Sequence, residues 1–339
     1  MSISQNNIND QGVVIKKTIG NYSVYTNGRT ILCELSNRLW KELVYPTADP
    51  SSLRHSVRDV RINVHMDPVA VGDTVRFVNA HNGSSLIVEV LPRRNKLVRR
   101  SAVPMPGAHA FEQVIAANVD QVVPVFSATN PAPKWHLLDR YLASAESLEI
   151  PALVCITKLD LVQAKDNSSG DELNHAAEEY QKIGYPVIFT SSVTGEGLGT
   201  IQNALKGRIS VFVGKSGVGK TSLLNAIQPG LGLRVNEVNH TTGKGKHTTT
   251  HMEMFLLDFG GSIIDTPGIR EFGLWDLDND DLALFFPEMR QLIGRCKFAL
   301  DCQHENEPGC AIRKAVTAGQ ISPRRYQSYL QMKVDGYFI

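Results

Sequence analysis

The chain has 339 residues, of which 42% are hydrophobic and 20% charged, and its formal net charge at pH 7 is +1. This length predicts two or three domains, and this composition supports ordinary packed cores, which excludes a chain that stays unfolded by itself. The N-terminal run SISQNNINDQ has neither the basic start nor the apolar core of a signal peptide, and no later stretch is apolar enough to span a membrane. We therefore expect a soluble cytoplasmic protein that does not associate with membranes.

Short β segments fill the region from residue 13 to about residue 100. In the run NYSVYTNGRTILCEL, the pair Asn27-Gly28 separates two alternating segments, which predicts a tight hairpin turn. Two further strand-like runs follow in VAVGDTVRFVNAHNGSSLIVEVLP, separated by glycine-containing turns. The pattern predicts a small all-β barrel of about 90 residues.

Basic residues exceed acidic ones in the second part of this region. Nine basic and four acidic residues occur between 54 and 100, which leaves a local excess of five positive charges. The basic residues are Arg54, Arg58, Arg61, Arg76, Arg93, Arg94, Lys96, Arg99 and Arg100. Such an excess is typical of nucleic-acid binding, with a solvated basic surface or linker as the alternative. The run LPRRNKLVRRSAVPMPGAHAF has too many prolines and charges for a core element, and we expect the first domain boundary in it.

After residue 118 the pattern changes to alternating strands and helices. Residues 118–128, 152–158 and 186–192 are strand-like, whereas 135–149 and 170–184 have helical patterns. This alternation predicts a parallel sheet with helices on both faces. Pro124 lacks the backbone donor that an interior strand uses, which favours an edge strand or a bulge at this position.

A glycine-rich motif lies between an apolar strand and a helix in RISVFVGKSGVGKTSLLNAI. Its pattern is that of a phosphate-binding loop, and the strand and helix around it argue against a chance match. The glycines let successive backbone N–H groups and the helix N-terminus face phosphate oxygens. Lys220 is expected to reach the β and γ phosphates, and the Thr221 hydroxyl is expected to bind Mg²⁺. The expected phosphate-binding residues are Gly214, Lys215, Ser216, Gly217, Val218, Gly219, Lys220, Thr221 and Ser222.

Downstream, SIIDTPGIREFG places an aspartate at the end of an apolar strand. Asp265 is expected in the Mg²⁺ shell and the Gly268 amide at the γ-phosphate, as in the D-x-x-G element of GTPases. The stretch NEVNHTTGKGKHTTTHME between the two motifs suits a loop that orders around the γ-phosphate and the metal. Spacing does not decide which of Thr248, Thr249 and Thr250 binds the metal, and we assign Thr249, which with Thr250 lies nearest the following strand.

Recognition of the base is expected from segments that precede the phosphate loop. In TKLD, Asp160 would accept hydrogen bonds from N1–H and the 2-amino group of guanine, and the Lys158 stem would lie over the ring. Adenine presents an acceptor there, so the pattern predicts GTP over ATP, with a surface Lys–Asp pair as the alternative. Thr157 stands where Asn is commoner, which weakens a structural hydrogen bond more than base recognition. In TSSVTGEG, Ser191 and Ser192 are candidates to bind the guanine oxygen through their backbone N–H groups.

Three cysteines and one histidine cluster near the C-terminus in CKFALDCQHENEPGCAI. Cys296, Cys302, His304 and Cys310 supply three thiolates and one imidazole, a tetrahedral set for structural zinc without an open position for catalysis. Free cysteines beside a surface histidine are the alternative.

The last helix is expected in ISPRRYQSYLQMK, with Ser322 as its N-cap and Pro323 at its first position. Arg324, Arg325 and Lys333 would give this helix a basic face. The face would be solvated or in contact with RNA.

The five GTPase elements occur in the order base-recognition segment, base loop, phosphate loop, switch I and switch II, so the chain resembles a circularly permuted GTPase. With the basic barrel that ends in LPRRNKLVRR and the ending DCQHENEPGCAIRKAV, it is similar to the RsgA (YjeQ) family of GTPases that depend on the small ribosomal subunit. The resemblance spans residues 13–333. It implies an RNA-binding OB-fold at 1–105, a permuted GTPase at 106–274 in the order G4-G5-G1-G2-G3, and a mostly helical zinc-binding domain at 275–339.

The resemblance also implies an activity, the hydrolysis of GTP to GDP and phosphate, stimulated by the small ribosomal subunit during late maturation of that subunit. The expected ligands are Mg²⁺ with GTP, bound by Thr221, Thr249 and Asp265, and one structural Zn²⁺ per chain. The expected partner is the small subunit with its rRNA, for a chain that acts as a monomer. A nucleotide-gated RNA- or ribosome-binding protein with incidental hydrolysis is the alternative, whereas a P-loop enzyme acting on a small molecule would need a substrate pocket that the sequence does not indicate.

The catalytic residue is expected in switch I. Many GTPases orient the attacking water with a glutamine just after D-x-x-G, but Ile269 stands there and an isoleucine cannot hydrogen-bond to water. His247 in GKHTTT matches the switch I histidine of the family, and the resemblance implies that it orients the water once the loop is ordered. An exposed loop histidine without a catalytic role is the alternative.

Overall fold

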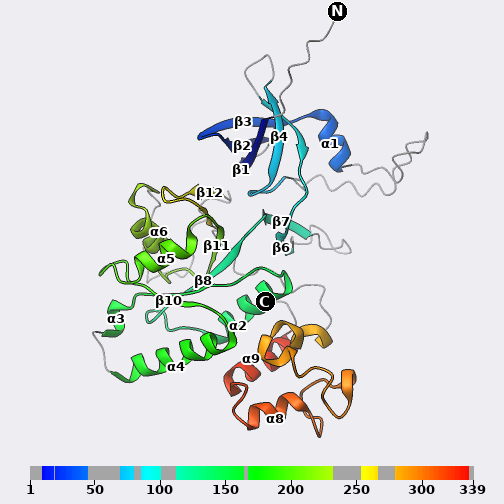
Figure 1. Cartoon of the computed structure of the whole chain (residues 1–339), viewed down its shortest axis with the longest axis vertical. Helices are drawn as coiled ribbons and strands as arrows, with labels where there is room; N and C mark the ends of the chain where they lie inside the picture. Colours follow the sequence, from blue (N-terminus) through cyan, green and yellow to red (C-terminus); the bar gives the residue numbers. More distant parts are fainter. Residues whose placement is uncertain are drawn as a thin grey trace, which may run out of the picture. The chain divides into compact units, whose positions relative to one another are not determined.

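The computed structural model describes residues 10–18, 20–44, 69–79, 85–100, 112–163, 167–231, 253–265 and 279–335. The chain divides into two compact units. The first comprises residues 1–119, 246–256 and 263–267, and the second comprises residues 120–245, 257–262 and 268–339. Figure 1 follows the elements along the chain.

Five strands of the first unit form a closed barrel. They are β1 (Asp10–Thr18), β2 (Asn21–Thr26), β3 (Arg29–Leu35), β4 (Thr74–Asn79) and β5 (Ser85–Val90), with helix α1 (Asn37–Val44) between β3 and β4. The strand order is β1-β2-β3-β5-β4, and the pairing of β1 with β4 closes the barrel. The pair β3–β5 is parallel and the other pairs are antiparallel. The predicted all-β barrel is confirmed.

The alternation of side chains along the strands builds the barrel core. In β2 every second residue is buried, beginning with Tyr22. Buried side chains from all five strands form one apolar cluster, which includes Val14, Val24, Cys33, Val75, Phe77 and Ile87. The turn between β2 and β3 has positive φ at Asn27 (47°) and Gly28 (79°), as a type I′ hairpin turn requires, so the predicted hairpin is confirmed.

Two further strands of the first unit, β6 (Lys96–Arg100) and β7 (Glu112–Ala117), form an antiparallel pair. Leu97 and Val98 of β6 are buried. We expected no core element in residues 91–111, and this expectation is wrong for β6. Its two apolar side chains are buried, and β7 is its partner strand. β12 (Glu253–Leu256) pairs with β1 in register Lys16–Glu253, and β13 (Ser262–Asp265) lies next to β12 in the sheet order.

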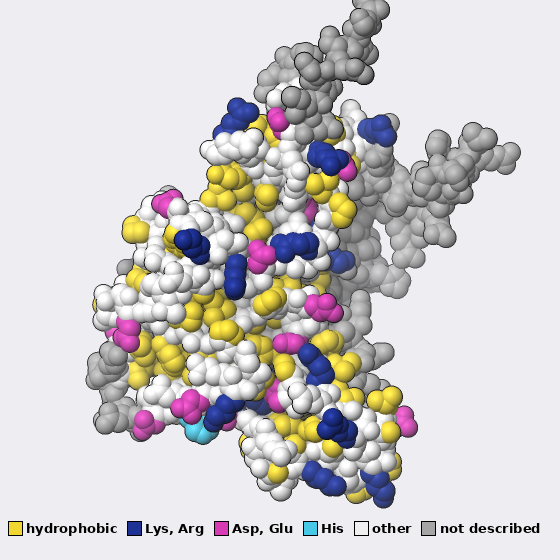
Figure 2. Space-filling model, viewed as in Figure 1, with side chains coloured by type: hydrophobic (Ala, Val, Ile, Leu, Met, Phe, Trp, Pro, Cys, Tyr) yellow, Lys and Arg dark blue, Asp and Glu magenta, His cyan; other side chains and the backbone are white. Residues whose placement is uncertain are grey.

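Part of the basic excess is neutralised within the first unit. The Arg93 guanidinium donates to both carboxylate oxygens of the buried Asp73, each at 2.7 Å. Arg76 donates to Glu89 at 2.7 Å on the barrel surface. On the face in Figure 2, the Lys and Arg side chains of the described residues are dispersed among Asp and Glu rather than gathered in one patch. Arg54, Arg58 and Arg61 lie outside the described residues.

The second unit contains a parallel sheet in the order β10-β9-β8-β11. Its strands are β8 (Gln121–Ser127), β9 (Val154–Thr157), β10 (Val187–Phe189) and β11 (Ile209–Val213). The accompanying helices are α2 (Trp135–Ser147), α3 (Asp160–Gln163), α4 (Asn167–Ile183), α5 (Leu198–Leu205), α6 (Lys220–Ile227) and the 3₁₀ turn η1 (Pro229–Leu231). In Figure 1, α2 and α4 lie on one side of this sheet and α5 and α6 on the other, which confirms the predicted arrangement.

Strand β8, which contains Pro124, lies inside the sheet between β9 and β11. The expectation of an edge strand is therefore wrong. The missing N–H of Pro124 is accommodated by an interruption of the β8–β9 ladder, which has an isolated bridge at Val122–Ala152 and resumes at Val125.

The C-terminal region of the second unit is mostly helical, as predicted. It contains η2 (Asn279–Phe285), α7 (Pro287–Arg290), η3 (Ala299–Asp301), α8 (Ala311–Thr317) and α9 (Pro323–Asp335). Its buried apolar side chains, among them Phe286, Met289 and Tyr329, form one cluster with Ala143 of α2. Helix α9 begins at Pro323, directly after Ser322, as predicted. None of the described helices is both long and apolar enough to cross a membrane.

Candidate functional site

The glycine-rich loop connects β11 to α6, so that Lys220, Thr221 and Ser222 form the first turn of α6. Gly219 has a φ of 94°, a conformation that disfavours any side chain at this position. Lys220 Nζ donates to the carbonyl oxygens of Gly214 at 2.6 Å and Lys215 at 3.0 Å. The ammonium group therefore lies beside the loop whose N–H groups are expected to bind phosphate.

Two side chains join the end of β9 to this loop. The Thr157 hydroxyl, which is buried, shares its one hydrogen between the carbonyl oxygens of Val218 and Phe126, the latter at 3.2 Å. Lys158 Nζ donates to the carbonyl oxygens of Gly217 at 2.7 Å and Asn130. A threonine in place of the commoner asparagine was expected to weaken a structural hydrogen bond here. The Thr157 hydroxyl nevertheless makes such a bond to the phosphate loop.

The Lys158 side chain also has an altered acidity. Burial lowers the pKa of its ammonium group, and the nearby Asp160 carboxylate opposes this effect. The carbonyl of Asn130, in the loop after β8, was not selected from the sequence, because a backbone acceptor leaves no side-chain pattern.

The two predicted base-recognition segments meet at neighbouring strand ends. Ser191 Oγ donates to Asp160 Oδ1 at 2.6 Å and accepts from the N–H groups of Val193 and Thr194 at 3.2 and 3.1 Å. Thr190, just before Ser191, donates its N–H to Ile156 of β9 at 2.7 Å. Ser192 is exposed. The structure therefore brings the Asp160 carboxylate and the 190–192 segment together, as the sequence predicted from their positions after β9 and β10.

The predicted switch residues are only partly described. His247, Thr249 and Gly268 lie outside the described residues, as do the other two threonines considered for the metal. Asp265 is the last residue of β13, and its side chain lies outside the described part.

The four predicted metal ligands lie together and are buried. The three thiol sulfurs and one nitrogen of His304 all lie within 4.8 Å of one another. His304 Nδ1 is 3.5 Å from both Cys296 Sγ and Cys310 Sγ, which are 3.9 Å apart. In a tetrahedral zinc site with Zn–S of about 2.3 Å and Zn–N of about 2.0 Å, ligand atoms lie roughly 3.5–3.8 Å apart. The donor set and its spacing fit zinc.

The surroundings of this cluster affect metal binding in opposite ways, because backbone N–H groups favour the thiolate whereas burial favours the protonated thiol. Backbone N–H groups of Ala311 and Arg313 donate to Cys296 Sγ at 3.2 Å and Cys310 Sγ at 3.5 Å. Burial raises the pKa of the Cys302 thiol to about 12 and lowers the pKa of the His304 imidazole. A metal that binds here must therefore displace protons from the cysteines.

Glu307 organises the loop that carries Cys302 and His304. Its carboxylate accepts hydrogen bonds from the N–H groups of Gln303 at 2.8 Å, Glu305 at 2.8 Å and Asn306 at 3.1 Å. Burial opposes the charge of Glu307, but these hydrogen bonds prevail and lower the pKa of its carboxyl group. Glu307 was not among the predicted site residues. The sequence indicates its role only by its position between the predicted ligands His304 and Cys310.

The prediction that α9 has a basic surface face is wrong, because two of its three basic side chains are buried. The Arg325 side chain is 1% exposed and the Lys333 side chain 6% exposed, and both form ion pairs within the second unit. Arg324 is paired with Glu179 at 2.6 Å. Arg325 and Lys333 are therefore buried inside the fold, whereas the paired Arg324 side chain remains 28% exposed.

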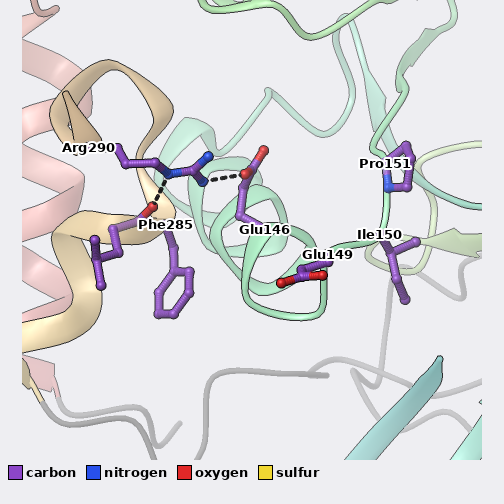
Figure 3. Close-up of a pocket in the computed structure, with 7 residues that line it drawn as sticks. Glu146, Glu149, Ile150, Pro151, Phe285 and Arg290 are labelled. Atoms are coloured by element: carbon purple, nitrogen blue, oxygen red, sulfur yellow. Dashed lines mark hydrogen bonds and ion pairs between the residues drawn. The ribbon is translucent and has the colours of Figure 1, made fainter.

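A separate hollow of about 510 Å³ lies between the end of α2 and the segment from η2 to α7 (Figure 3). It is lined by Glu146, Glu149, Ile150, Pro151, Leu284, Phe285 and Arg290. None of the predicted nucleotide-binding or metal-binding residues lines it. Glu146 and Arg290 are joined across it by an ion pair of 2.6 Å, so the hollow is a feature of the packing between α2 and the C-terminal region.

The fold and the site define a circularly permuted P-loop GTPase, because the base-recognition strand β9 precedes the phosphate-loop strand β11 in the chain while both belong to one parallel sheet. The model of the RsgA GTPase family matches residues 90–275. The chain belongs to the RsgA GTPase family and is a GTP hydrolase.

The relatives and solved structures that match cover from 79% to 98% of this chain. The small ribosomal subunit biogenesis GTPase RsgA of Bacteroides fragilis is 38% identical over 96% of both chains. The Pseudomonas aeruginosa protein of the same name is 42% identical over 79% of this chain and 76% of its own. The crystal structure of YjeQ from Thermotoga maritima matches with a TM-score of 0.72 at 31% identity, covering 97% of this chain and 98% of that one. YloQ, described as a circularly permuted GTPase, matches with a TM-score of 0.70 at 29% identity over 98% of this chain and 97% of its own.

Proposed function

We propose that the chain hydrolyses GTP in response to the small ribosomal subunit and acts late in the maturation of that subunit. The proposal rests on sequence identity to relatives that are named for small ribosomal subunit biogenesis. For the Bacteroides fragilis relative this identity is 38% and extends over 96% of both chains. The matched length of 96% of this chain extends beyond the residues 90–275 that the GTPase family model matches. The chain would act as a monomer in the cytoplasm.

The nucleotide would lie across the C-terminal ends of β9, β10 and β11. Asp160 would accept from guanine, and the bond from Ser191 Oγ holds that carboxylate at the strand end before nucleotide binds. The loop from Gly214 to Ser222 would bind the phosphates, and Lys220 would leave its carbonyl partners for the β and γ phosphates. The remaining proposed contacts are those of Thr157, Lys158, Ser192, Asp265 and Gly268.

Magnesium and zinc would have different roles. Mg²⁺ would arrive with GTP and be bound by Thr221, Thr249 and Asp265, where it neutralises charge on the phosphates. One Zn²⁺ per chain would be bound by the Cys₃His cluster and stabilise the C-terminal region without taking part in hydrolysis. His247 would orient the attacking water.

The chain would consist of three functional parts. Residues 1–105 would form an RNA-binding OB-fold, residues 106–274 the GTPase and residues 275–339 the zinc-binding domain. RNA contacts of the barrel would come from basic residues other than Arg93, whose charge is paired with Asp73. A nucleotide-gated ribosome-binding protein with incidental hydrolysis is the second candidate, since it would use the same site.

Sedimentation with purified ribosomal subunits tests the proposed partner. We expect the protein to pellet with small subunits in the presence of a non-hydrolysable GTP analogue, and to pellet less with GDP. Lys220→Ala, which lacks the phosphate-binding ammonium group, should lose the dependence on nucleotide. Equal binding to large subunits, or no binding to small subunits, would contradict the proposal.

A further inference from the structure

Helix α9 contacts two different parts of the second unit through its two halves. Its first half meets α2, which precedes strand β9 in the chain, and α4, which follows β9 and α3. Its second half meets the loop between the metal ligands Cys302 and Cys310. In Figure 1, α9 lies beside α2 and close to the remaining C-terminal helices.

The first half of α9 is held by a buried ionic cluster centred on Arg325. Its guanidinium donates to Asp139 Oδ1 of α2 at 2.8 Å and to both carboxylate oxygens of Glu288 at 2.8 and 3.1 Å. Asp139 is fully buried, and its Oδ1 also accepts from the Tyr180 hydroxyl of α4 at 2.7 Å. Because a buried charge without its partner is strongly unfavourable, these contacts favour one docked position of α9 over solvent-exposed alternatives.

Arg324 strengthens the same contact from the neighbouring position. It donates to Glu179 Oε2 at 2.6 Å and to the Tyr180 hydroxyl at 2.8 Å, and its guanidinium lies 5.2 Å from the ring centre of Trp135. Ser322 donates to the other oxygen of Glu179 at 3.0 Å. The start of α9 is therefore tied to α2 and to α4 by charged hydrogen bonds.

The second half of α9 binds backbone groups of the metal loop. The Tyr326 hydroxyl donates to the carbonyl of His304 at 2.7 Å, and the Tyr329 hydroxyl donates to the carbonyl of Gln303 at 3.2 Å. Lys333 Nζ donates to the same Gln303 carbonyl at 2.9 Å and pairs with Glu305 at 2.8 Å. In this conformation the same loop also brings Cys302 and His304 to the other two predicted ligands.

We propose that α9 couples metal binding to the docking of the C-terminal region on the GTPase helices α2 and α4. The inference rests on the proposed metal site. When the metal leaves, the 303–305 loop loses the conformation that Tyr326, Tyr329 and Lys333 bind, and the second half of α9 loses these hydrogen bonds. Because coupling between two sites is reciprocal, breaking the Arg325 cluster must in turn weaken the hold on the metal.

A second contact between the same parts supplies a matched control. Arg290 of α7 pairs with Glu146 at the end of α2, as Figure 3 shows, and this ion pair is partly exposed. It involves neither α9 nor the metal loop. An Arg290→Met variant therefore removes an arginine that bridges the same two regions but leaves the proposed connection intact.

The test measures zinc content first and then the affinity for zinc, by competition with a coloured chelator. We expect about one zinc per chain, an affinity at least tenfold weaker for Arg325→Met, a smaller loss for the isosteric Asp139→Asn, and an affinity within about twofold of the unmodified protein for Arg290→Met. Arg325→Met and Asp139→Asn proteins that both bind zinc with the unmodified affinity would overturn the coupling.

A second measurement needs no variant and so does not depend on whether Arg325→Met folds. Amide hydrogen exchange of the unmodified protein is compared with zinc bound and after chelation. We expect faster exchange after chelation in α2 as well as in the metal loop, whereas exchange confined to the metal loop would overturn the coupling. Absence of zinc from the unmodified protein would instead overturn the metal assignment itself.

Discussion

The hydroxyl of Thr157 donates a hydrogen bond to the backbone carbonyl of Val218, and this bond joins the base-recognition strand to the phosphate loop. Both groups are buried. A threonine at this position therefore performs the structural task expected of the commoner asparagine, with a hydroxyl in place of an amide. The contact links the two halves of the proposed nucleotide site.

Replacing Thr157 by valine should weaken nucleotide binding without changing the shape of the side chain. The substitution leaves a buried carbonyl without its donor, which costs about 1–3 kcal/mol. We expect GDP affinity to fall roughly tenfold, as measured by titration with a fluorescent GDP analogue. Thr157→Ser retains the hydroxyl and should bind nearly as well as the unmodified protein. Equal affinities of the valine and serine variants would show that the bond does not support the site.

Replacing Asp160 by asparagine should change which base is bound. In the proposed site the carboxylate would accept from two donors of guanine, whereas an amide would offer one donor and one acceptor. We expect GTP affinity to fall roughly a hundredfold and affinity for the xanthine nucleotide, which carries a carbonyl in place of the 2-amino group, to rise. Competition binding with the two nucleotides measures both changes. Glu196→Gln, at an exposed carboxylate of the neighbouring loop, is the control and should keep the preference for GTP.

Replacing Cys302 by serine should release the metal. A serine hydroxyl is a far weaker zinc ligand than a thiolate, so we expect zinc content to fall from about one per chain to near zero and the thermal unfolding midpoint to fall with it. Elemental analysis and calorimetry measure the two quantities. Cys33→Ser lies in the barrel core and outside the cluster, and should keep its zinc. Full zinc content in Cys302→Ser would contradict the ligand assignment.

Replacing His247 by alanine should separate binding from turnover. The phosphate loop and Asp160 remain, so GTP affinity should stay within about twofold, while subunit-stimulated hydrolysis should fall by about 10²-fold or more because the attacking water loses its orienting group. His251→Ala, in the same stretch of sequence, is the matched control and should retain stimulated hydrolysis. Unchanged turnover of His247→Ala would remove this residue from the mechanism.

The parts of the site that follow strands were predictable from sequence. Asp160 and Ser191 follow two apolar strands whose alternation with helices predicted a parallel sheet, and the structure places their side chains 2.6 Å apart. The cluster of three cysteines and one histidine was predictable from the close spacing of these residues in the chain.

Other features depended on partners far away in the chain. Arg325 is separated from Asp139 by 186 positions, and a basic residue on a helix carries no local sign that its partner is buried. The edge strand expected at Pro124 was wrong for a comparable reason. The interior strand β8 accommodates the proline by an interruption in its ladder to β9, and no local sequence pattern reveals such an interruption. Sequence reasoning therefore located the chemical groups but not the contacts that hold the C-terminal region on the GTPase.

Activation by the small ribosomal subunit is measured as the rate of GTP hydrolysis by the purified protein alone, with small ribosomal subunits, and with large subunits as the control. We expect a slow basal rate that small subunits raise at least tenfold and large subunits leave unchanged. A rate that small subunits do not raise, in a protein that binds GTP normally, would contradict the proposed function.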